Sequence, residues 1–217
     1  PTGERSGFLL GPGPGLARMK LWLLRHARVL AAPGLCYGAS DLPAAPEATH
    51  AAAQAAAAVL PAGLPVWVSG LQRAQQLAHD LHTLRPDLGA PRRDLRLNEM
   101  DFGCWEGHTW DHIPRTAVDA WTTDFAHHRF GGAESTQQVI DRVTAALADL
   151  VAQVGQDGEA LWVTHAGVTK AVMVLAERGY QPPLQASEWP AHGPGPGGLC
   201  AVALCWPLRA GSRAAPR

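Results

Sequence analysis

Three short apolar runs in this chain lead directly into basic side chains. The runs and the side chains that follow them are Leu21–Leu24 with Arg25 and His26, Val66–Val68 with Arg73, and Leu161–Thr164 with His165. Short runs of this composition are typical of buried strands in an α/β sheet, whose carboxyl ends face the crevice that binds ligands. The pattern therefore predicts three strands of one sheet whose basic residues meet in the same crevice.

The predicted cluster has the composition of a phosphate pocket. Arg25 and Arg73 can each offer a planar fork of donors that fits phosphate oxygens in a bidentate way, which lysine cannot do. His26 can attack phosphorus through a neutral ring nitrogen, and His165 can donate to the oxygens of the transferring group. Gly167 allows close backbone approach, and the N-terminus of the helix that follows favours an anion. These residues indicate phosphoryl-group chemistry.

Strands that alternate with helices along the chain predict an α/β fold. The expected fold is a three-layer sandwich, with a mostly parallel central sheet flanked by helices. Ser135 opens the clearest helix, because Gln138 stands three residues later as in a capping box. The last strand is nearly all apolar, which predicts an interior position in the sheet. The expected strands are 20–24, 66–68, 161–164 and 199–206, and the expected helices are 46–60, 71–84, 135–154 and 167–177.

The length of 217 residues fits one domain. Residues 1–18 contain the proline- and glycine-rich run Gly11–Gly15, and we expect them to be a mobile leader, with the globular part starting at Met19. Residues 19–217 then form the domain. Within it, residues 91–134 are rich in tryptophan and phenylalanine and are predicted to be an excursion that covers the crevice of the sheet.

The composition limits the classes of partner. The formal net charge is −1 and charged residues make up 17% of the chain, so no broad basic surface suggests nucleic acid. No apolar run is long enough to span a membrane, and the N-terminus has no secretory signal pattern. The four cysteines lack zinc-site spacing and fit free thiols of a cytoplasmic protein. His108 and His112 have the spacing of a helical metal pair, but no third ligand is obvious and we expect no metal site.

A leaving alkoxide needs a proton, which calls for a carboxylic acid at the mouth of the pocket. The segment 97–107 offers three candidates, which are Glu99, Asp101 and Glu106. The residue types alone leave all three open.

Four segments, in order along the chain, resemble the motifs of the histidine phosphatase superfamily, also called phosphoglycerate-mutase-like. The segments are Leu24-Arg25-His26, Ser69-Gly70-Leu71-Gln72-Arg73, Leu97-Asn98-Glu99 with Phe102-Gly103 and Trp105-Glu106-Gly107, and Thr164-His165-Ala166-Gly167. The resemblance covers residues 19–206. Gly70 departs from the pattern, because proline is common at that position.

The resemblance implies a role for each matched residue. The implied roles are nucleophile for His26, phosphate ligand for Arg25 and Arg73, second pocket histidine for His165, proton donor for Glu99 and structural support for Glu106.

The loop after the first strand bears on the substrate. Gly34–Gly38 is similar to the corresponding loop of the α-ribazole phosphatase branch of the superfamily, which acts in cobalamin assembly. By that likeness Cys36 and Tyr37 are candidate substrate contacts, with simple loop packing as the alternative. Phosphoglycerate-type mutases usually have glycine after the nucleophilic histidine, where this chain has Ala27, which disfavours mutase activity.

The sequence therefore predicts a metal-independent phosphomonoester hydrolase that works through a phosphohistidine on His26 and needs no cofactor. Its expected partner is a small-molecule phosphomonoester, with an α-ribazole phosphate-type ester as the candidate substrate, and not nucleic acid or a membrane. The alternatives are a phosphoglycerate-type mutase, a protein-phosphohistidine phosphatase and a non-catalytic phosphate-binding module. The physiological substrate and the oligomeric state do not follow from the sequence.

Overall fold

The structure is a computed structural model that describes residues 18–181, 183 and 185–208. The strands are β1 (Arg18–Arg25), β2 (Val66–Val68), β3 (Arg92–Arg93), β4 (Glu159–Thr164) and β5 (Leu199–Cys205). The α-helices are α1 (Pro46–Ala57), α2 (Gln72–Leu84), α3 (Arg115–Thr123), α4 (Thr136–Val154) and α5 (Ala166–Arg178). Residues 1–17 of the predicted leader lie outside the described residues, and Arg18, its last residue in the prediction, already belongs to β1.

The five strands form one sheet in the order β3-β2-β4-β1-β5. The three strands predicted from the apolar runs, β1, β2 and β4, are adjacent and parallel. Their ends are level, because Arg25 pairs with Thr164 and Val68 pairs with Val163. The residues that follow these strands therefore leave the sheet at the same edge, as predicted.

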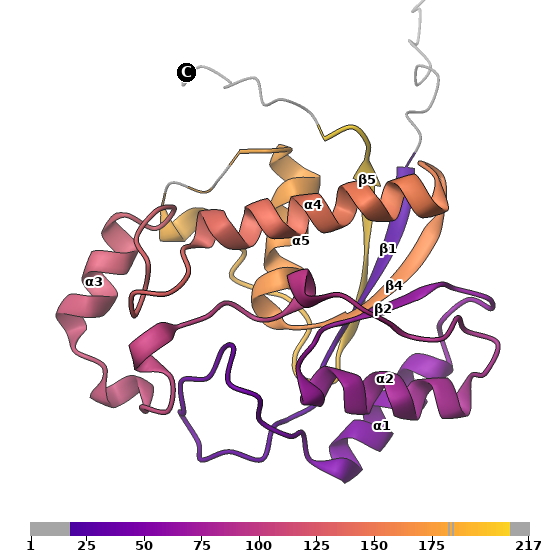
Figure 1. Cartoon of the computed structure of the whole chain (residues 1–217), viewed down its shortest axis with the longest axis horizontal. Coiled ribbons are helices and arrows are strands. Elements are labelled where there is room, and N and C mark those ends of the chain that lie inside the picture. The colour runs from indigo at the N-terminus through magenta and orange to yellow at the C-terminus, as the bar shows by residue number, and fades with distance from the viewer. Residues whose placement is uncertain (1–17, 182, 184, 209–217) are drawn as a thin grey trace, which may run out of the picture.

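Helices cover both faces of the sheet, so the fold is the predicted α/β sandwich of three layers (Figure 1). Successive side chains of a strand point to opposite faces of its sheet. On one face Leu21 and Trp162 pack in a core cluster with α4 and α5. On the other face Leu24 and Val163 pack in a second cluster with α1 and α2.

The predicted interior position of the last strand is wrong. β5 lies at the edge of the sheet and runs antiparallel to β1. Ala201 and Ala203 are exposed, whereas Leu204 is buried in the core. Alanine is apolar but small, so a run of apolar residues can expose one face without exposing much hydrocarbon. An apolar run of this kind is therefore compatible with an edge strand.

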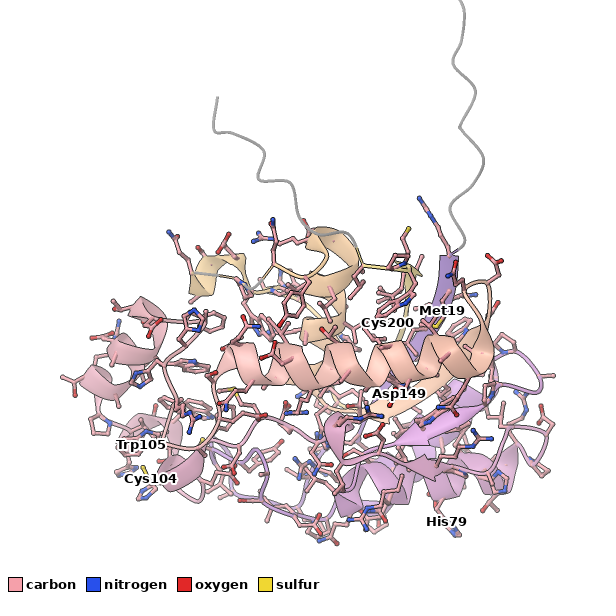
Figure 2. All side chains as sticks on the ribbon, turned by 45° about the horizontal axis from the view of Figure 1, so that its top comes forward. Met19, His79, Cys104, Trp105, Asp149 and Cys200 are labelled. Atoms are coloured by element: carbon pink, nitrogen blue, oxygen red, sulfur yellow. The ribbon has the colours of Figure 1, made fainter. Side chains whose placement is uncertain are left out.

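Two of these strands and α-helices have no counterpart in the prediction. β3 consists of two exposed residues, and α3 lies within the predicted excursion 91–134. Figure 1 shows α3 to one side of the sheet, and Figure 2 shows Cys104 and Trp105 at that same end of the molecule. The excursion therefore extends the molecule beside the sheet, and its covering role stays a prediction.

Helix α4 begins at the predicted capping box. The Ser135 hydroxyl accepts from the N–H of Gln138, and the Gln138 side chain accepts from the N–H of Ser135. The four cysteines are free thiols. Over the described ranges, none of the helices combines the length and the apolar character that crossing a membrane requires.

Candidate active site

The strand ends bring the predicted basic residues together at the carboxyl edge of the sheet. His26 follows β1, His165 follows β4, and Arg73 lies in the first turn of α2, which follows β2. The ring centroids of His26 and His165 are 5.0 Å apart. His26, Arg73 and His165 are 2%, 0% and 0% exposed. The site is therefore a buried group of basic side chains.

The hydrogen bonding of His26 defines which ring nitrogen can react. Nδ1 lies 2.7 Å from the carbonyl oxygen of Ala27, which can only accept, so Nδ1 carries the ring proton and Nε2 is unprotonated. Burial lowers the pKa of His26 to about 3. The hydrogen bond to Ala27 opposes this shift, whereas the charges of Arg73 and Arg25 add to it. The ring is therefore neutral near pH 7, with a lone pair on Nε2 that can act as a nucleophile.

Arg73 is held by the loop after β1. Its terminal nitrogens donate to the carbonyl oxygens of Gly38, at 2.6 Å, and Ser40, at 2.7 Å. Glu106 holds this loop in turn, because its carboxylate accepts from the N–H groups of Ala39 and Ser40 and from the Ser40 hydroxyl. Burial alone raises the pKa of Glu106, but these hydrogen bonds outweigh it and lower the pKa. Glu106 therefore supports Arg73 through the loop, without contacting it.

Three buried polar atoms in the site have no hydrogen-bond partner within the described residues, namely Arg25 Nε, Arg73 Nε and His165 Nδ1. Neither arginine forms an ion pair with any carboxylate that the structure describes. Buried polar groups in proteins are normally paired, and leaving one unpaired is costly. An anion with several oxygens, such as a phosphoryl group, would accept from both arginine N–H groups.

A chain of hydrogen bonds behind His165 orients its ring. His165 Nε2 lies 2.7 Å from Ser69 Oγ, which lies 2.9 Å from Asn98 Oδ1. The N–H of Gly70 also donates to Asn98 Oδ1, at 2.7 Å, so this atom is the amide oxygen and not the nitrogen. Ser69 therefore donates to Asn98 and accepts from His165 Nε2–H. The glycine that replaces the expected proline matters here, because proline has no N–H to donate.

The same series of hydrogen bonds places the ring proton of His165 on Nε2 and leaves Nδ1 without one. Burial first, and then the charge of Arg73, holds the pKa of His165 well below its ordinary value, so the ring is neutral. Nδ1 is then an acceptor, which differs from the donor role that the sequence predicted. It can pair with the hydroxyl of a singly protonated phosphoryl group, or donate after an incoming anion has favoured its protonation.

We expect Ser69→Ala to weaken the binding of inorganic phosphate about tenfold, because His165 Nε2–H loses its acceptor and the ring loses its fixed orientation. Calorimetric titration measures the dissociation constant. Thr164→Val is the matched control. The Thr164 hydroxyl is also buried and donates to the Leu97 carbonyl oxygen at 2.8 Å, but it takes no part in the hydrogen bonds that join His165, Ser69 and Asn98. Equal losses of affinity in the two variants would contradict an orienting role for Ser69.

Glu99 reaches the site from the segment that precedes α3. The N–H of Gly167, in the first turn of α5, donates to both carboxylate oxygens of Glu99, at 3.0 and 3.1 Å. A Cβ atom at residue 167 would collide with the carboxylate, so this contact requires glycine. Arg142 of α4 fixes the segment by donating to the carbonyl oxygens of Arg96, at 2.6 Å, and Asn98, at 2.7 Å.

The three candidate acids differ in their surroundings. Asp101 accepts from the N–H of Gly103 at 2.8 Å, and Glu106 holds the loop of residues 38–40. Glu99 instead lines a cavity together with Gly167. Burial lowers the pKa of Arg73, and the charge of Glu99 is the main influence that opposes this shift. Among the three acids, Glu99 therefore lies both near the basic site and beside a space for a substrate.

The two candidate substrate contacts in the loop are placed differently. The Cys36 side chain is fully buried in the core, and burial raises the pKa of its thiol to about 12. This placement favours the packing role for Cys36. The Tyr37 ring lies against Arg73, with 5.3 Å between its centroid and the guanidinium carbon, so Tyr37 stays a candidate contact. No group of three or more potential metal ligands occurs in the described ranges, and His108 and His112 belong to none.

No function was predicted for Ser69, Asn98 or Arg142. Ser69 and Asn98 lie inside the motifs that carry the family resemblance, which is the signal that could have singled them out. Arg142 stands beside the apolar stripe of α4, and a charged residue at such a position is a weaker signal.

Most of this chain matches one known protein family. Residues 21–191 match the family described as Histidine phosphatase superfamily (branch 1). A 6-phosphofructo-2-kinase/fructose-2,6-bisphosphatase from Caenorhabditis elegans is 33% identical over 115 residues, which cover 51% of this chain and 23% of that protein. The chain therefore corresponds to less than a quarter of that relative.

Several solved structures are similar to the whole fold. Mycobacterial hydrolase 2 has a TM-score of 0.72 and 27% identity, covering 86% of this chain and 82% of its own. A mycobacterial glucosyl-3-phosphoglycerate phosphatase has a TM-score of 0.71 and 26% identity, covering 86% and 90%. The protein TTHB049 from Thermus thermophilus has a TM-score of 0.62 and 30% identity, covering 88% and 96%. The mycobacterial phosphatase also has structures in complex with inorganic phosphate and with VO3.

Proposed function

Because the chain belongs to branch 1 of the histidine phosphatase superfamily, we propose that it hydrolyses phosphomonoesters through a phosphohistidine on His26. One observation carries this proposal. Around the neutral His26 ring, three buried polar atoms lack partners among the described residues, and they come from Arg25, Arg73 and His165. A phosphoryl group bound there would meet the His26 nucleophile and the two guanidinium groups that can stabilise its negative charge.

In the first step the lone pair of His26 Nε2 forms a bond to phosphorus while the bond from phosphorus to the alcohol oxygen breaks. The bonding electrons leave with that oxygen, which takes a proton from the Glu99 carboxyl group. Arg25 and Arg73 stabilise the negative charge on the remaining phosphoryl oxygens. Since two guanidinium groups supply this positive charge, we propose that the reaction needs no metal ion.

In the second step water attacks the phosphorus of the phosphohistidine. The Glu99 carboxylate accepts a proton from the water, the nitrogen–phosphorus bond breaks, and its electrons return to Nε2. Inorganic phosphate leaves, and Glu99 is again a carboxylic acid. The neutral His26 ring, with its proton held on Nδ1 by Ala27, is then ready for the next substrate.

For the substrate we infer a small phosphomonoester of the α-ribazole phosphate type in cobalamin assembly, supported by the likeness of Gly34–Gly38 to that branch. A phosphorylated sugar acid or a sugar bisphosphate is the alternative, because such compounds appear in the names of the mycobacterial and nematode relatives. Mutase activity is disfavoured by Ala27. The four free thiols support a cytoplasmic location.

The proposed intermediate can be trapped. Brief incubation with a 32P-labelled phosphomonoester, followed by quenching in denaturant, should leave label on the protein that survives mild base and is lost in acid, because a phosphoramidate has this stability. Peptide mapping should place the label on His26. Label that is lost in base would identify a carboxylate as the nucleophile, and release of an isomerised phosphoester instead of inorganic phosphate would favour a mutase.

A further inference from the structure

A cavity of about 160 Å³ lies next to the proposed general acid, with Glu99 and Gly167 on one side. Four aromatic side chains form much of its remaining wall, namely Phe102, Trp121, Phe125 and Trp189. Trp121 stacks on Phe125 with 5.5 Å between ring centroids and lies edge-on to Phe102 at 6.1 Å. Helix α3, which carries Trp121, lies on the same side of the molecule as the start of α4 (Figure 1).

Two polar atoms of the cavity residues are buried and have no hydrogen-bond partner in the described part of the chain, namely Thr136 Oγ1 and Trp121 Nε1. Thr136 is 2% exposed. Since buried polar groups are normally paired, the cavity wall has hydrogen-bonding capacity that the described residues do not use. Trp121 Nε1–H can only donate, whereas the Thr136 hydroxyl can donate or accept.

The charges near the cavity disfavour a cationic ligand. Aromatic cages in other proteins bind quaternary ammonium groups through the negative faces of their rings. Here, however, Lys170 lines the cavity, and its pKa is lowered first by burial and then by the positive charge of Arg25. The charge of Glu99 opposes this shift, but a single carboxylate does not balance the two positive charges of Lys170 and Arg25. A third positive charge would be repelled by Lys170 and Arg25.

We infer that this cavity binds the alcohol part of the substrate and that this part carries an uncharged, planar aromatic ring. The inference rests on the proposed function, because a phosphoryl group at His26 places the leaving oxygen at Glu99 and the rest of the alcohol in the cavity. A protein cavity of about 150 Å³ can hold a benzene molecule, so a ring of that size fits here. The four aromatic residues supply the ring faces and edges against which such a ring packs.

A matched series of esters tests the inference. 2-Phenylethyl phosphate, ethyl phosphate and phosphocholine are all esters of primary alcohols, so their leaving groups need a proton to a similar degree. We expect kcat/KM for 2-phenylethyl phosphate to exceed that for ethyl phosphate at least about tenfold, because only the former fills the cavity. Phosphocholine should be no better than ethyl phosphate.

Two tryptophan variants test whether the preference for 2-phenylethyl phosphate comes from the cavity. Trp121→Ala should bring the ratio of kcat/KM between 2-phenylethyl and ethyl phosphate close to one. Trp110→Ala is the matched control and should keep the ratio, because Trp110 also packs edge-on to Phe102, at 5.7 Å, but does not line the cavity. If Trp121→Ala does not fold, the comparison of the three esters on the unmodified protein still tests the inference.

The outcomes separate the inference from the function it rests on. Similar kcat/KM values for all three esters, or a preference for phosphocholine, would overturn the aromatic-ring assignment while leaving the phosphatase activity in place. A ratio that falls equally in Trp121→Ala and Trp110→Ala would overturn the cavity as its source. No hydrolysis of any ester and no phosphohistidine would instead overturn the proposed function.

Discussion

Replacing His26 by alanine is expected to lower kcat for a phosphomonoester by at least about a thousandfold, because the variant has no nucleophile to form the covalent intermediate. The buried ring of His26 presents an unprotonated Nε2, whereas the neighbouring His165 has a proton on Nε2 that it donates to Ser69. Steady-state turnover of 4-nitrophenyl phosphate measures the loss, and the labelling experiment should find no phosphoprotein.

A matched histidine variant shows whether the loss is specific. His79 lies on α2 and is exposed, so His79→Ala should keep the activity. Substantial turnover by His26→Ala with an unchanged circular dichroism spectrum would place the nucleophile on another residue.

Because the pKa of His26 is about 3, the acid limb of kcat/KM for the unmodified protein should not show the titration of an ordinary histidine near 6.5.

The basic part of the site could be predicted because its signal is local. Each of β1, β2 and β4 is a short apolar run, and a basic residue follows within a few positions. Parallel neighbours with level ends then bring Arg25, His26, Arg73 and His165 together without further information. Local composition fails for β5, because Ala201 and Ala203 read as apolar although they face outwards at the edge of the sheet.

The parts of the site that were missed depend on contacts between distant residues. Ser69 contacts His165 across 96 positions in the chain and Asn98 across 29. A hydroxyl or an amide has no preferred partner that can be inferred from its sequence neighbours, so its role appears only when the fold is known. Cys36 illustrates the same limit, because the likeness of a loop to that of a relative does not show which side chains point into the core.

Glu99→Gln should lower kcat/KM for 2-phenylethyl phosphate at least about a hundredfold and for 4-nitrophenyl phosphate by far less. Glutamine has nearly the same size as glutamate and can still accept from the N–H of Gly167, but it has no acidic proton to give. An alkoxide is a poor leaving group without that proton, whereas 4-nitrophenolate leaves readily as an anion. The ratio kcat/KM is the appropriate measure, because it covers the steps up to cleavage of the phosphorus–oxygen bond.

Glu106→Gln is the matched control for this prediction. The Glu106 carboxylate accepts four hydrogen bonds, from Ala39, Ser40 twice and Phe102, and a glutamine NH2 group would face some of these donors with a donor. The variant should therefore unfold at lower temperature and weaken the hold of the loop on Arg73. Because Arg73 acts on the phosphoryl group and not on the leaving group, any loss of activity should be the same for both esters.

The pattern across the two variants and two esters decides between the acids more firmly than either variant alone. A general loss of activity in Glu99→Gln could reflect a displaced Gly167 or a disturbed helix α5, and such damage would slow both esters equally. Only the loss of a proton donor depends on how badly the leaving group needs a proton. If Glu106→Gln shows this dependence and Glu99→Gln does not, the proton comes from Glu106, and the contacts of Glu99 with Gly167 serve only to fix the segment that carries it.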